Sequence, residues 1–163
     1  MIWTSRPDTQ ACCPGPHGPV GAGEKLARLL HTRNIEPAFD PFRRSDFFPP
    51  HNRPVSNTCG CADGCSVVRC ATLSDAAIWD RSARQAGKRA GREPQGAWVA
   101  NVDDLRAIGR TDSPDGQVVR IYDDPTGEDP LHAIIRGRET LDRPDQDRLR
   151  ERIRQRFSTR IGP

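Results

Sequence analysis

The first 65 residues carry no sustained pattern of apolar and polar positions. Nine of the fifteen prolines lie in this segment, and each fixes its own φ angle and pushes the preceding residue out of the helical region. Only Leu26, Leu29 and Leu30 follow a regular spacing, which is typical of a short amphipathic helix near residues 23–33. We therefore expect residues 1–65 to be a Pro-rich, largely irregular segment that contains this one helix.

A regular pattern begins with the β-branched run SVVRCATL, which predicts a strand at residues 66–73. Ser74 is a suitable N-cap for a helix at residues 75–89, and Asp75 complements the dipole of that helix. The side chains that we expect to face a sheet are small or aromatic and recur at helical spacing: Ala76, Trp79, Ala83, Ala86 and Ala90.

Two further runs, AWVANV at residues 97–102 and LHAIIRG at residues 131–137, are strand candidates. Between them, LRAIGR and QVVRIYDD flank the turn-forming sequence TDSPDG. This arrangement predicts a β-hairpin whose turn lies at residues 111–116.

A last helix is expected after Asp142, which is a suitable N-cap with Asp145 at the capping-box position. Leu149, Ile153 and Phe157 recur every four residues, so this helix presents one narrow apolar stripe to the core.

The order of strand, helix, several strands and helix predicts the α+β class. We expect a small antiparallel or mixed sheet with two flanking helices that cover one face. This domain would span residues 66–160, preceded by the irregular segment.

Composition limits the class of protein. Leu, Ile, Val and Phe make up 30 of 163 residues, below the roughly 20% at which disorder becomes a serious alternative. The net charge of only +3 argues against full disorder, so we expect a small core with large irregular parts. No apolar run approaches the roughly 18 residues of a membrane span, and no signal peptide is recognised. We expect a soluble, cytoplasmic protein without a membrane partner. The preference for Arg over Lys, 23 against 2, is typical of a GC-rich, bacterial coding sequence.

Four cysteines, Cys59, Cys61, Cys65 and Cys70, lie within twelve residues. Their thiolates would suit zinc or an iron–sulfur cluster, with His51 as an alternative fourth ligand. The spacing C-x-C-x₃-C-x₄-C differs, however, from the paired knuckles of structural zinc sites. The alternative is that Cys70 is a buried apolar residue of the strand. We expect no cofactor.

Two surfaces are candidates for partners. Phe39, Phe42, Phe47 and Phe48 lie in a Pro-bracketed segment, which suits a peptide that docks in the groove of a partner protein, or else a loop that folds back on the domain. The last helix is rich in arginine, and Arg148, Arg152 and Arg156 are its candidates for contacts with nucleic-acid phosphates. The alternative is a solvated helix, because acidic residues offset these charges.

His132 follows an acidic loop that contains Asp123, Asp124, Glu128 and Asp129. These carboxylates could orient the imidazole for acid–base chemistry or bind a hard cation through their oxygens. A catalytic role for His132 would need a nucleophile or a second acid nearby in space. The alternative is a histidine that braces the loop. With no catalytic motif in the sequence, we expect a non-catalytic interaction or accessory domain that binds an unknown protein. Nucleic-acid association, with or without a Cys-cluster metal, is the second hypothesis, and an enzyme built around His132 is the third.

Overall fold

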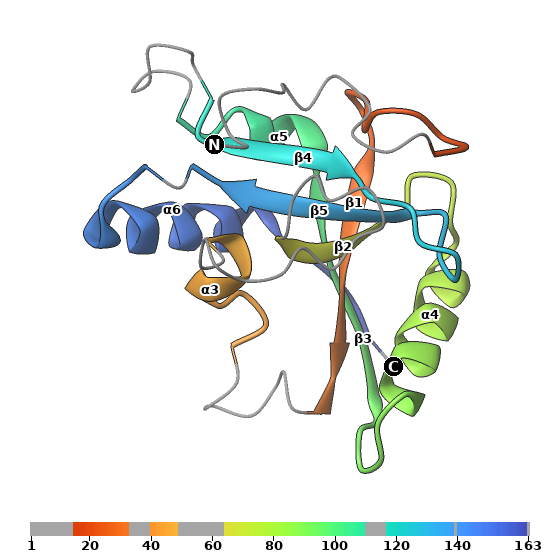
Figure 1. The fold of residues 1–163 in the computed structure, drawn as a ribbon. Helices are drawn as coiled ribbons and strands as arrows, with labels where there is room; N and C mark the ends of the chain where they lie inside the picture. The colour runs from red at the N-terminus through yellow and green to blue at the C-terminus, as the bar shows by residue number, and fades with distance from the viewer. Residues whose placement is uncertain (1–14, 33–39, 49–63, 110–116, 139, 163) are drawn as a thin grey trace.

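The protein has an α+β fold built on one six-stranded antiparallel sheet (Figure 1). The computed structural model describes residues 15–32, 40–48, 64–109, 117–138 and 140–162. The strands are β1 (Lys25–His31), β2 (Cys65–Arg69), β3 (Pro94–Asn101), β4 (Val119–Asp123), β5 (His132–Gly137) and β6 (Thr159–Ile161). Their order across the sheet is β4-β5-β2-β1-β3-β6.

Helices cover both faces of this sheet, rather than the one face expected from the sequence. The described residues contain α3 (Arg44–Phe47), α4 (Asp75–Gly87), α5 (Val102–Arg106) and α6 (Arg143–Arg156). Helix α4 shares one apolar cluster with β1, β2 and β3, whereas α3, α5 and α6 share a larger cluster on the other face. Figure 1 shows α4 on the opposite side of the sheet from α3 and α6. None of the described helices is long and apolar enough to cross a bilayer.

The helix caps that the sequence indicates are formed. The Ser74 side chain accepts a hydrogen bond from the Ala77 amide, and the Asp142 carboxylate accepts one from the Asp145 amide at 2.8 Å. The expected stripe of α6 is buried as well: Leu149, Ile153 and Phe157 are each at most 4% exposed.

The buried face of α4 differs from the predicted stripe of alanines. Ile78, Ser82 and Ala86 are buried, whereas Ala76 and Ala90 are exposed. The Ser82 hydroxyl donates to the Leu30 carbonyl at 2.7 Å and accepts from the Gly96 amide at 3.2 Å. These hydrogen bonds to β1 and β3 satisfy a buried hydroxyl and fix the rotation of the helix.

The helix predicted near residues 23–33 is wrong, because this segment forms strand β1 between β2 and β3. Leu26, Ala27 and Leu30 are all at most 3% exposed. A strand that is buried on both faces has a continuous apolar run instead of an alternating one, and such a run cannot be told from a buried helix by spacing. The sheet therefore does not begin at residue 66, and the predicted boundary between segment and domain is wrong for the described residues.

The phenylalanine segment is part of the core and does not form a docking arm. Phe42, Phe47 and Phe48 are 2%, 0% and 8% exposed. The Phe42 ring lies 4.8 Å, centroid to centroid, from that of Phe157 on the last helix. Phe39 lies outside the described residues. The expected partner-binding role of the three described rings is therefore wrong, because their apolar surface is already covered.

The predicted hairpin is wrong too, since β4 pairs with β5 and not with the sequence LRAIGR. Val102–Arg106, which includes the start of that sequence, is helix α5, with Val102 and Leu105 buried. The predicted turn at residues 111–116 lies outside the described residues.

Candidate functional site

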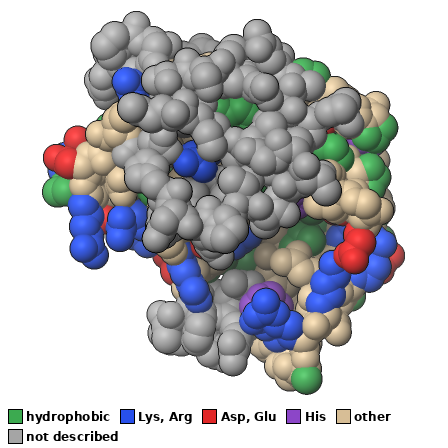
Figure 2. Space-filling model, in the orientation of Figure 1, with side chains coloured by type: hydrophobic (Ala, Val, Ile, Leu, Met, Phe, Trp, Pro, Cys, Tyr) green, Lys and Arg blue, Asp and Glu red, His purple; other side chains and the backbone are tan. Residues whose placement is uncertain are grey.

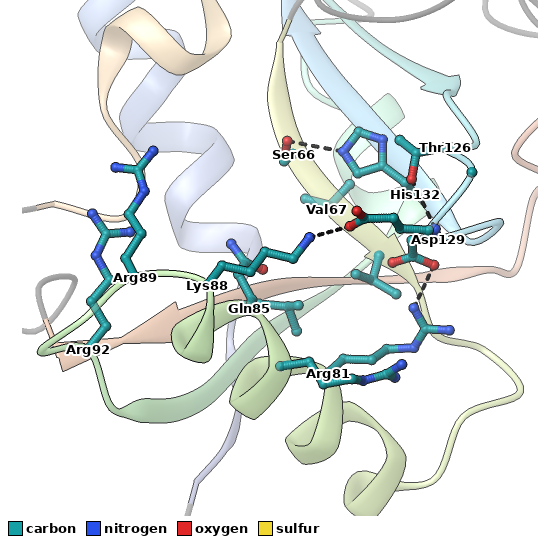
Figure 3. Close-up of a pocket in the computed structure, with 15 residues that line it drawn as sticks. Ser66, Val67, Arg81, Gln85, Lys88, Arg89, Arg92, Thr126, Asp129 and His132 are labelled. Carbon is teal, nitrogen blue, oxygen red and sulfur yellow. Dashed lines mark hydrogen bonds and ion pairs between the residues drawn. The ribbon is translucent and has the colours of Figure 1, made fainter.

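A cleft of about 790 Å³ lies between helix α4 and the loop that joins β4 to β5 (Figure 3). Its wall on the sheet side comes from Leu29 of β1 and from Ser66, Val67 and Val68 of β2. His132 and Asp129 line the loop side. The volume is within the range of small-molecule sites, roughly 300–1,000 Å³.

Three adjacent strands place an aspartate, a histidine and a serine on one face of the sheet beside this cleft. His132 begins β5 and pairs with Val68, and Ser66 lies two residues before Val68 in β2, on the same face of the sheet. Asp124 directly follows β4, and its amide donates to the His132 carbonyl at 3.1 Å, which continues the β4–β5 pairing. The side chains of Asp124, His132 and Ser66 are therefore neighbours on consecutive strands.

Hydrogen bonds connect these three side chains in a chain. The Nδ1 atom of His132 lies 3.0 Å from the Asp124 carboxylate and 2.7 Å from the Asp124 carbonyl. Both partners can only accept, so Nδ1 carries the proton. The other ring nitrogen, Nε2, lies 3.1 Å from the hydroxyl oxygen of Ser66. In the neutral ring, Nε2 therefore accepts the Ser66 proton.

The environment of His132 raises its pKa above the ordinary value. Burial by itself would lower this pKa, but the hydrogen bonds from Nδ1 to Asp124 and the charges of Asp124 and Asp129 outweigh it. The basic side chains of Arg81 and Lys88 face His132 from across the cleft (Figure 3). The Asp124 side chain is 8% exposed, so its charge is poorly screened by water. Ser66 is exposed, which leaves its hydroxyl accessible from the cleft.

The loop between β4 and β5 is held by its own hydrogen bonds and by α4. The Thr126 amide donates to the Asp129 carbonyl and the Asp129 amide to the Thr126 hydroxyl. Across the cleft, Arg81 contacts Asp129 at 2.5 Å and Lys88 contacts Glu128 at 2.6 Å. The half-buried Arg81–Asp129 pair ties the His132 side of the cleft to α4, whereas the Lys88–Glu128 pair is exposed to water.

Asp123, the neighbour of Asp124, points to the other face of the sheet and has a structural role. Its carboxylate accepts from Arg69 at 2.9 Å, and Arg69 also contacts Glu24 at 2.6 Å and the Gly18 carbonyl. Burial raises the pKa of Asp123, against the opposing effect of Arg69. This ion-pair network ties the chain before β1 to β2 and β4.

The predicted four-cysteine metal site is not formed as expected. Cys65 and Cys70 are 1% and 4% exposed and belong to the apolar clusters on opposite faces of the sheet, so they cannot bind one metal ion. Burial raises the pKa of each thiol to about 11, which disfavours the thiolate. Among the described residues there is no group of three or more metal ligands. Cys59, Cys61 and His51 lie outside them.

The three arginines proposed for nucleic-acid contacts are exposed on α6. Arg148, Arg152 and Arg156 follow one another every four residues, and Arg148 pairs with Asp145. Their exposure agrees with both a solvated helix and a phosphate-binding one, so nucleic-acid binding stays a prediction.

The sequence indicates only part of this site. It identified His132 and the acidic loop, and the structure selects Asp124 from the four carboxylates. It missed Ser66, which was assigned only to a strand. Ser66 is 66 residues from His132, and no local signal in the sequence indicates the strand pairing that brings them together.

Comparison with known proteins gives no relative from which a role could be inferred. No family model, curated protein or solved structure matches this chain.

Proposed function

We propose that this chain is a serine-dependent hydrolase, with Ser66 as nucleophile, His132 as general base and Asp124 as the positioning residue of the imidazole. The observation that carries the proposal is the hydrogen-bonded chain from Asp124 through His132 to an exposed serine in a cleft. A carboxylate, a histidine and a serine that are hydrogen-bonded in this order activate the serine hydroxyl in known hydrolases, and the arrangement recurs on unrelated folds. The non-catalytic interaction domain expected from the sequence loses its proposed aromatic docking arm, since Phe42, Phe47 and Phe48 are core residues.

The reaction follows from the protonation states of the three side chains. Ser66 Oγ attacks the carbonyl carbon of an ester while Nε2 of His132 takes the hydroxyl proton. The bond to the leaving alkoxide then breaks, and the protonated His132 gives its proton to that oxygen. Water, deprotonated in turn by His132, hydrolyses the acyl-serine and restores the free hydroxyl. The negative charge of Asp124 stabilises the imidazolium in both steps.

The cleft supports this chemistry through its charge. Five basic and two acidic side chains line it: Arg81, Arg84, Lys88, Arg89 and Arg92 against Glu128 and Asp129. A net positive field in a partly enclosed cleft favours the oxyanion that develops during attack on a carbonyl.

A fluorophosphonate probe tests the proposal without knowledge of the substrate. Attack by Ser66 on phosphorus would expel fluoride and add the probe covalently, which intact-mass spectrometry detects. We expect Ser66→Ala to abolish labelling and His132→Gln to slow it at least about 100-fold. Ser158→Ala, which removes another exposed serine, is the matched control and should label like the wild type.

The role of Asp124 needs a second measurement. Asp124→Asn should slow labelling and also move the midpoint of its pH profile downward, because the carboxylate raises the pKa of His132. Labelling that is absent in the wild type, or unchanged in Ser66→Ala, would refute the proposed function.

A further inference from the structure

The basic residues of the cleft are not all used by the loop that faces them. Arg81 and Lys88 pair with Asp129 and Glu128, which accounts for both acidic side chains that line the cleft. Arg89 and Arg92 lie beyond the C-terminal end of α4, in the turn before β3, and also line the cleft. The Arg89 side chain has no ion-pair partner among the residues that the structure describes.

A turn holds Arg89 and Arg92 next to each other. The Arg92 amide donates to the Arg89 carbonyl at 3.4 Å, and Gly91 between them has φ +75°, a conformation that L side chains rarely adopt. The Arg92 guanidinium also contacts Nε2 of His31 at 3.2 Å, which orients it. Figure 3 shows the two arginine side chains beside each other.

This arginine pair and the reactive serine lie at different ends of the cleft. In Figure 3, Ser66 and His132 are on one side, Arg89 and Arg92 on the other, and Gln85 and Lys88 between them. On the face shown in Figure 2, several separate Lys and Arg side chains lie on the lower half of the described surface, with Asp and Glu side chains next to some of them. A ligand that spans the cleft would therefore meet a nucleophile at one end and two guanidinium groups at the other.

We propose that the cleft binds an elongated, anionic ligand whose phosphate or carboxylate group contacts Arg89 and Arg92. Guanidinium groups bind both kinds of anion through paired N–H donors. At the Ser66 end of the cleft, the inference rests on the proposed function. The substrate is then an ester whose acid or alcohol part carries a negative charge at a distance from the ester bond.

An NMR titration of the full chain tests the anion site independently of catalysis. Inorganic phosphate and succinate are added in separate experiments, with chloride keeping the ionic strength constant. We expect Arg89→Gln/Arg92→Gln to raise the Kd of the preferred anion about tenfold, which corresponds to two exposed ion pairs. The tighter of the two anions identifies the group as phosphoryl or carboxylate.

Arg152→Gln/Arg156→Gln is the matched control, because it removes the same two charges from exposed positions on α6, across the sheet. This variant should change the Kd less than twofold. Equal weakening in both double variants, or no binding of either anion, would overturn the inference. If the first double variant unfolds, Arg89→Gln alone replaces it, with about a threefold increase expected.

The outcomes separate this inference from the proposed function. Absence of anion binding by the wild type, together with intact fluorophosphonate labelling, refutes the arginine site and leaves Ser66 as nucleophile. Arginine-dependent anion binding without labelling supports the site and refutes the hydrolase. If Arg89→Gln/Arg92→Gln lowers the melting temperature but leaves the anion affinity unchanged, the two arginines stabilise the C-terminal end of α4 instead of binding an anion. That result would also overturn the inference.

Discussion

Replacement of Phe47 by alanine tests whether the segment before β2 belongs to the core. Phe47 is fully buried in the same apolar cluster as Leu149 and Ile153 of α6. A buried phenylalanine removes roughly 200 Å² from water, worth about 5 kcal/mol at about 25 cal/mol per Å², and measured Phe→Ala changes in cores cost about 3–5 kcal/mol. We therefore expect the free energy of unfolding to fall by about 4 kcal/mol, a large part of the roughly 5–15 kcal/mol of a typical domain.

Urea unfolding followed by tryptophan fluorescence measures this change. With a slope of about 2 kcal/mol per M, the midpoint should fall by about 2 M. Ser45→Ala is the control, because Ser45 is exposed in the same short helix, and it should shift the midpoint by less than about 0.3 M. A Phe47→Ala midpoint within about 0.5 M of the wild type would show that this segment docks loosely and that the assigned core is wrong.

Three further predictions concern the sheet, the last helix and the histidine. A fragment of residues 66–163 lacks β1, which pairs with both β2 and β3, so its circular dichroism should show no cooperative melt. Ile153→Asp should lower the free energy of unfolding by about 3 kcal/mol or more because it buries a charge, whereas Arg152→Glu, at an exposed position, should lower it by about 0.5 kcal/mol or less. Equal midpoints of urea unfolding in the two variants would contradict the assignment of Ile153 to the buried face of α6. The raised pKa of His132 stabilises the folded state fully below about pH 6.5, and this contribution is lost as pH rises through the folded pKa. Because Asp124 contributes to the raised pKa, an NMR titration should give His132 a higher pKa in the wild type than in the Asp124→Asn variant.

The local signals in the sequence were sufficient where one element decides its own structure. Ser74 and Asp142 cap their helices through hydrogen bonds to amides three residues away, so the sequence contains both partners. The stripe of Leu149, Ile153 and Phe157 likewise depends only on the helical repeat. The α+β class follows from these elements and their order.

The tertiary structure decided what depends on neighbours that are distant in the chain. Strand β1 is buried on both faces because β2, β3 and helices surround it, and its three leucines also fit a helical spacing. The rotation of α4 was set by hydrogen bonds from Ser82 to β1 and β3. Neither the burial of β1 on both faces nor the rotation of α4 can be read from the pattern of apolar and polar residues in its own segment.

The candidate site divides in the same way. Asp124 and His132 are eight residues apart in the chain, so the sequence already indicates that they lie close together. Ser66 joins them only through the pairing of β2 with β5, and a shift of that pairing by one residue would turn its hydroxyl to the other face of the sheet. Strand register is fixed by the burial of both faces together, which is a property of the whole fold and not of any segment.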